Sequence, residues 1–123
     1  MKISDEKTLR ELQDEFHEAF PFLKIEFYST THAEGKGSSK HQLLNPDLKV
    51  ENARTVHNSG FIKMDCDLTV EAFEQTIQKI FGLNVQVFRK SFGQWVQTWS
   101  TDSWTLKEQN LRGMLTQSRL SII

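Results

Sequence analysis

The sequence is poor in cysteine and in long apolar runs. Cys66 is the only cysteine among 123 residues, and one thiol forms neither an internal disulfide nor a cysteine zinc cluster. No apolar run approaches the roughly 20 residues that a membrane helix requires. The stretch MKISDEKTLRELQDEF carries acids where a secretion signal needs an unbroken apolar segment. We therefore expect a cytoplasmic protein that does not enter a membrane.

The chain also lacks an excess of either charge. It has 15 basic and 16 acidic residues, for a net charge of −1. A domain that binds nucleic acid through phosphate contacts usually carries a clear basic excess, because counterion release supplies much of its affinity. Nucleic acid is therefore not favoured as a partner. The hydrophobic share of 37% is typical of a globular protein, and the length suits one domain over residues 1–123.

The apolar residues between positions 5 and 19 recur three or four residues apart, which predicts an amphipathic helix. Ser4 is a plausible N-cap, and Pro21 ends the helix because it removes a backbone donor. The apolar stripe of this helix must be buried somewhere. It can lie beside a second helix, or it can cover the other face of the sheet.

A second helix is predicted over residues 69–81, and it has the clearest local signals. Thr69 can cap it, and the spacing of Leu68 and Phe73 is that of a hydrophobic staple. Gly82 can take the left-handed conformation that closes a helix.

Alternating apolar and polar residues predict strands over residues 22–28, 60–66 and 83–91, and a returning strand over 94–100. Residues 29–59 have no sustained periodicity, so we expect a mobile loop with at most one helical turn at 39–44. The capping box Thr-Leu-Lys-Glu at 105–108 predicts a short helix that ends near Gly113. The remaining tail can add a strand or fray. We recognise no internal repeat.

This order of elements resembles the ubiquitin-like β-grasp. The resemblance depends on the stretches DLTVEAFEQTIQKIFGL and TLKEQNL and on the hairpin between them. It implies an α+β fold with one β-grasp sheet, an extra N-terminal helix and a long insertion between the first two strands. It also implies protein binding through the open face of the sheet. The chain does not end in the diglycine of conjugated modifiers. A ferredoxin-like α+β sandwich is the alternative fold.

The stretches FPFLKIEF, VQVFRKS and TDSWTLKEQN are similar to those of a small family of uncharacterised bacterial proteins. This resemblance spans nearly the whole chain and implies no activity.

Catalytic and metal-binding patterns are weak in this sequence. The stretch EGKGSSK at 34–40 lacks the spacing of a phosphate loop. The histidines include no pair with zinc spacing; they are His17, His32, His41 and His57. Four acids at the start of the second helix are more simply explained by the helix dipole than by catalysis; they are Asp65, Asp67, Glu71 and Glu74. Cys66 fits a buried structural thiol. We predict no catalytic residue, cofactor or metal ligand, and an enzyme is not favoured.

The aromatic hairpin VFRKSFGQWVQTWSTDSW raises the question of register. With a two-residue turn at Phe92 and Gly93, Lys90 faces Trp95, and the valines form one apolar face that covers the second helix. With a three-residue loop, the tryptophans join the core instead. We favour the two-residue turn because it gives one continuous apolar face.

In that register, we predict that an aromatic patch on the sheet binds a protein partner. The residues assigned to it are Phe88, Arg89, Lys90, Trp95 and Trp99. Tryptophan and arginine are the residues that most often anchor interfaces. Two other functions stay open: a single-stranded nucleic-acid binder that stacks bases on these rings, and a small-molecule or metal site under the 29–59 loop.

Overall fold

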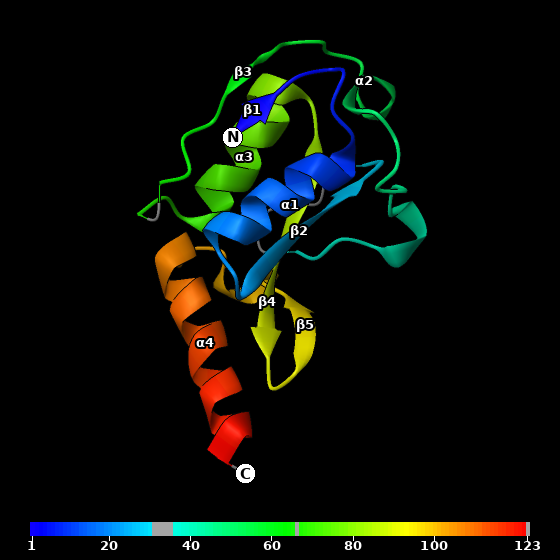
Figure 1. Ribbon diagram of the computed structural model, residues 1–123. Coiled ribbons are helices and arrows are strands. Elements are labelled where there is room, and N and C mark those ends of the chain that lie inside the picture. The colour runs from blue at the N-terminus through cyan, green and yellow to red at the C-terminus, as the bar shows by residue number, and fades with distance from the viewer. Residues whose placement is uncertain (31–35, 66, 123) are drawn as a thin grey trace.

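The protein has an α+β fold, as expected (Figure 1). The computed structural model describes residues 1–30, 36–65 and 67–122, and the side chains of the last helix as far as residue 117. Its strands and helices are β1 (Lys2–Ile3), α1 (Leu9–Ala19), β2 (Leu23–Tyr28), α2 (Val50–Ala53), β3 (Gly60–Phe61), α3 (Val70–Phe81), β4 (Asn84–Ser91), β5 (Gln94–Gln97) and α4 (Leu106–Ile122). Two single-turn 3-10 helices lie at Lys40–Gln42 and Trp99–Thr101.

The main sheet is antiparallel and has the strand order β2-β4-β5. Lys90 faces Trp95 and Phe88 faces Gln97, so the register of the two-residue turn is confirmed. Phe92 and Gly93 have φ values of 48° and 86°, and two positive φ values define the tight turn that matches the twist of a hairpin.

The helices pack on one face of the sheet. Val85 and Val87 of that inner face are buried together with Leu23, Ile25 and Phe27 of β2. The predicted second helix, α3, lies against β4, and Thr69 and Gly82 cap it as expected. The ring centroids of Phe16 in α1 and Phe73 in α3 are 5.1 Å apart. The first helix therefore lies beside the second and does not cover the other face.

The opposite face of the sheet is called the outer face below. It carries Lys24, Glu26, Tyr28, Gln86, Phe88, Lys90, Trp95 and Gln97.

The first helix begins later than expected. Thr8 is its N-cap, because Glu11 N–H donates to Thr8 Oγ1 at 3.2 Å while Thr8 N–H donates to Glu11 Oε1 at 3.4 Å. This reciprocal pair satisfies two backbone donors, whereas a cap at Ser4 satisfies one. The prediction of Ser4 was therefore wrong, and strand β1 precedes the cap.

The strand expected at 60–66 is short and lies outside the main sheet. In the described part, residues 60–65, only Gly60–Phe61 forms a strand, and it pairs with Lys2–Ile3 in a separate two-stranded sheet. A β-grasp sheet would contain this strand beside β2, so the β-grasp assignment is not confirmed, although the α+β class is.

Part of the 29–59 segment, around residues 42–44, bonds to the edge of β2. Leu44 N–H donates to Phe27 O and Ser29 N–H donates to Gln42 O, both at 2.8 Å. The turn expected at 39–44 is present as Lys40–Gln42. Helix α2 was not expected, since four residues give too little periodicity to detect, yet its Val50 is fully buried.

Helix α4 does not end near Gly113 but continues to Ile122, so the short helix and the extra strand were wrong predictions. Gly113 is instead where α4 approaches the sheet. A Cβ at this position would lie 2.8 Å from Phe22 Cβ and 3.2 Å from Lys90 O. The glycine is required by close packing and not by a helix end.

We expect Gly113→Ala to destabilise the protein by about 1 to 3 kcal/mol, because the added methyl group forces α4 away from Phe22. Helix propensity alone predicts the opposite sign, a gain of about 1 kcal/mol. Urea unfolding measures the difference, and Lys107→Ala on the exposed side of the same helix is the control. A Gly113→Ala protein as stable as the wild type would contradict the close approach.

One pattern of backbone hydrogen bonds occurs twice among the described residues. The start of α1 exchanges backbone hydrogen bonds with the start of α2, and the start of α3 exchanges them with the start of α4. The donor–acceptor pairs are Leu9 to Leu48, Val50 to Lys7 and Arg10 to Pro46 in one half, and Val70 to Trp104, Leu106 to Leu68 and Glu71 to Asp102 in the other.

Backbone groups make these bonds, and the buried side chains differ between the two places, so the sequence shows no repeat there.

Candidate functional site

One end of the outer face is covered. Ser38 N–H donates to Gln97 Oε1 at 2.8 Å, and Gln97 Nε2 donates to Ser38 O at 2.9 Å. Ser38 Oγ also donates to Gln86 Oε1 at 3.3 Å. Gln86 is consequently buried although it lies on the polar side of the sheet, and Tyr28 on the same side is buried as well.

The other end of the outer face is open and carries four side chains that we call the aromatic–lysine cluster: Lys24, Phe88, Lys90 and Trp95. Lys24 Nζ lies 5.0 Å from the centroid of the Phe88 ring and 5.3 Å from that of Trp95. Lys90 Nζ lies 4.8 Å from the Trp95 centroid. All three distances fall within the range of cation–π attraction. The four residues are half-buried, so the rings remain accessible at their edges.

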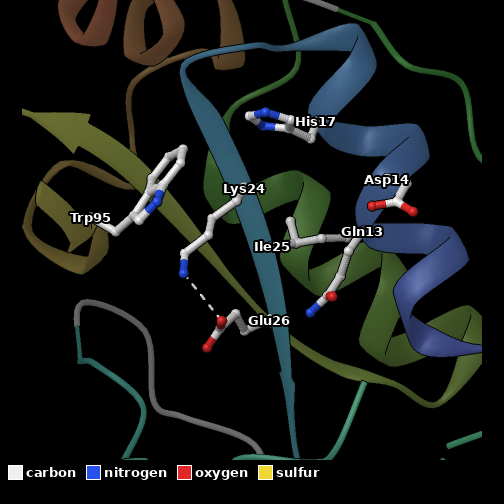
Figure 2. A pocket seen from close by; sticks show the side chains of 7 residues that line it. All are labelled: Gln13, Asp14, His17, Lys24, Ile25, Glu26 and Trp95. Atoms are coloured by element: carbon white, nitrogen blue, oxygen red, sulfur yellow. Dashed lines mark hydrogen bonds and ion pairs between the residues drawn. The ribbon is translucent and has the colours of Figure 1, made fainter. Parts of the chain in front are cut away.

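A hollow of about 210 Å³ adjoins the cluster between α1 and β2. Figure 2 shows Trp95 on one side of it and His17 of α1 on another, with Lys24 paired to Glu26 at 3.1 Å. The lining residues are Gln13, Asp14, His17, Lys24, Ile25, Glu26 and Trp95. Sites for drug-sized ligands measure roughly 300 to 1,000 Å³. This hollow suits one side chain of a partner better than a cofactor.

His17 has a defined tautomer in this hollow. Its Nδ1 lies 2.8 Å from Leu23 O, and a carbonyl oxygen only accepts, so Nδ1 carries the proton. When the ring is neutral, Nε2 is therefore the acceptor. The ring meets Trp95 edge-on at 6.1 Å between centroids, which holds the indole between α1 and the lysines.

Three of the five predicted contact residues come together here: Phe88, Lys90 and Trp95. Arg89 does not, because alternation along β4 turns it to the inner face. Its Nη1 donates to Gln109 Oε1 at 2.8 Å, and its guanidinium lies 5.6 Å from the Trp104 ring. Burial lowers the pKa of Arg89. Its assignment to the patch is corrected: Arg89 joins α4 to the sheet.

Trp99 is also outside the cluster. Strand β5 ends at Gln97, so alternation no longer applies two residues later, where the chain turns into a 3-10 helix. Trp99 is 44% exposed and lies at the covered end of the outer face, close to Gly37. Neither Trp95 nor Trp99 is a core residue beneath α3.

Lys24 is the cluster residue that sequence reasoning missed. Alternation places Lys24 on the polar side of β2. Its place in the cluster follows only from the pairing of β2 with β4, which puts Lys24 opposite Phe88. The sequence shows the alternation within β2, but it does not show that β4 is the strand beside β2.

The other histidines and acids are distributed over several segments of the chain. In the described ranges, no three His, Cys, Asp or Glu side chains are placed to hold a metal ion. His57 Nδ1 lies 2.9 Å from Asp5 Oδ2, far along the chain from His17 and His41. His32, Cys66 and residues 34–35 lie outside the described residues. Within that same part of the chain, no helix has the length and apolar character needed to cross a bilayer.

Glu74 differs from its expected role at an exposed helix terminus. It is buried, and its Oε2 accepts Val87 N–H at 2.8 Å. Burial raises the pKa of Glu74 to about 8, with a further contribution from the neighbouring charges of Asp102 and Glu71. The interpretation of Glu74 as a helix-dipole residue is therefore corrected.

Comparisons of the chain with protein-family models, curated proteins and solved structures find no match. The site must therefore be interpreted from its own geometry.

Proposed function

We propose that this protein is a non-enzymatic protein-interaction module that binds its partner with the open end of the outer face. The observation that carries the proposal is the aromatic–lysine cluster, in which two ammonium groups lie over two half-buried rings. No described helix covers this part of the sheet face. Tryptophan beside cations is typical of residues that anchor interfaces. The single Cys66 remains our reason to expect action in the reducing cytoplasm.

The charges of the cluster indicate an acidic partner. Lys24 is paired with Glu26, but Lys90 has no carboxylate partner among the described residues. A carboxylate from the partner would meet Lys90 at the edge of the Trp95 ring, where both charges are partly removed from water. The adjacent hollow can take one side chain beside it.

A selection from a random displayed 12-residue peptide library tests the proposal. We expect peptides enriched in Asp and Glu, with affinities that fall roughly tenfold or more in Trp95→Ala and in Lys90→Glu. Trp99→Ala and Lys79→Glu make the same changes at exposed positions outside the cluster, so affinity should stay within about twofold of the wild type in both. Circular dichroism checks that each variant is folded.

Two results would overturn this function. The first is the absence of acidic peptides whose binding depends on Trp95. The second is tight binding of a thymidine oligonucleotide that weakens steeply with salt and requires the same rings, since this is the behaviour of a single-strand nucleic-acid binder.

A further inference from the structure

The outer edge of β5 has no partner strand among the described residues. In a hairpin with a two-residue turn, Ser91 and Gln94 exchange hydrogen bonds, and every second residue then points its backbone groups at the partner strand. The backbone groups of Val96 accordingly point toward β4. Thr98 N–H continues this alternation, because it donates to Val87 O at 3.2 Å. The N–H and C=O groups of Trp95 and Gln97 point away from the sheet, where no backbone or side-chain group of the described residues bonds to them.

This edge also lacks the usual protection against strand pairing. Exposed edge strands commonly carry a charge, a proline or a bulge, each of which prevents another strand from adding. The four residues of β5 read Gln-Trp-Val-Gln and have none of these. Strand β5 is the last in the order of its sheet, and no ribbon lies against its far side in Figure 1.

The free edge and the aromatic–lysine cluster meet at Trp95. Its outward backbone belongs to the edge, and its side chain forms cation–π contacts with Lys24 and Lys90. A strand that added to β5 would present every second side chain on the outer face, beside the indole. The edge would supply backbone hydrogen bonds, and the cluster would select the side chains.

We propose that an extended acidic segment of another protein pairs with β5 as a fourth strand of the sheet. This inference rests on the proposed function and adds the mode of binding. The occupant is acidic because Lys90 lacks a carboxylate partner in the described structure. A second copy of the chain fits less well, because its own β5 would bring two glutamines, a tryptophan and a valine to the interface, and no acid.

Amide hydrogen exchange followed by NMR tests the pairing without a mutation. In the free protein, the amides of Trp95 and Gln97 should exchange at least tenfold faster than that of Val96, which is bonded to β4. Addition of an acidic peptide selected as above should slow the Trp95 and Gln97 amides roughly tenfold or more and leave Val96 unchanged. Two versions of a selected peptide can be N-methylated, one at the odd and one at the even residues. One version should lose binding and the other should keep it, since only one of these two sets of amides faces β5.

The results separate the mode of binding from the function. If selected peptides need Trp95 and Lys90 but do not protect these two amides, the strand addition is wrong and the proposed function stands. If no peptide depends on Trp95, both fail. Protection that appears without peptide and rises with protein concentration, together with a dimer in analytical ultracentrifugation, would identify a second copy as the occupant and overturn the acidic segment.

Discussion

Glu74→Gln is expected to be more stable than the wild-type protein at about pH 9, and the advantage should disappear near pH 4.5. The carboxyl group of Glu74 is buried beneath the sheet and has a pKa of about 8 instead of 4.5. The folded protein therefore holds this proton more tightly than the unfolded chain does. The stabilisation that the protonated Glu74 contributes is fully present below pH 4.5, and it is lost as the pH rises through about 8.

Glutamine removes this loss because it has no charge to bury. Its amide oxygen can still accept Val87 N–H, and its amide nitrogen can donate toward the carboxylates of Asp102 and Glu71, which raise the pKa of Glu74. At about 1.4 kcal/mol for each pKa unit, the variant should gain on the order of 4 kcal/mol at high pH.

Urea unfolding between about pH 4.5 and pH 9 measures the effect. Glu18→Gln makes the same change on an exposed helix position, and its unfolding free energy should follow that of the wild type at every pH. A difference between Glu74→Gln and the wild type that does not vary with pH would contradict the buried, protonated carboxyl group.

Arg54→Ala should destabilise the protein by roughly 2 to 4 kcal/mol. The guanidinium of Arg54 is completely buried and donates to three separate parts of the chain. It reaches Asp5 Oδ1 at 2.8 Å, Asn58 O at 2.8 Å and Phe81 O at 2.9 Å. Alanine leaves the buried Phe81 carbonyl without this donor and separates the N-terminal segment from the end of α3.

Arg10→Ala is the matched control. Arg10 pairs with Asp47 at 3.1 Å, but the two side chains are 54% and 72% exposed, so its loss should cost less than about 0.5 kcal/mol. The loss of unfolding free energy in Arg54→Ala should also be smaller at low pH. The hydrogen bond from Arg54 holds the pKa of Asp5 below 3.8, so this interaction is lost as the pH falls through the lowered value. Equal losses in the two variants would contradict the buried role of Arg54.

The sequence predicted correctly those elements that are specified by a few neighbouring residues. Thr69, Phe73 and Gly82 define both ends of α3 because a cap, a staple and a left-handed glycine act over one helical turn. Phe92 and Gly93 defined the hairpin register for the same reason, and the register then separated Phe88 and Trp95 from the valine core.

Predictions that needed a distant partner were less accurate. Gly113 was interpreted as a helix end because its contact with Phe22 lies far away in the sequence. Arg89 was assigned to the patch by composition, although the alternation of β4 places it under α4 near Trp104. Lys24 was overlooked until its strand was paired with β4.

The sequence by itself determined the α+β class, the long second helix and the hairpin with its aromatic outer side. These follow from periodicity, caps and turn residues, which are short-range properties of the chain. The tertiary structure alone decided which strands pair, that α1 and α4 cover one face of the sheet, and that no described strand pairs with the outer edge of β5. Strand pairing and helix docking join residues that are far apart along the chain, and no local pattern specifies such a partner.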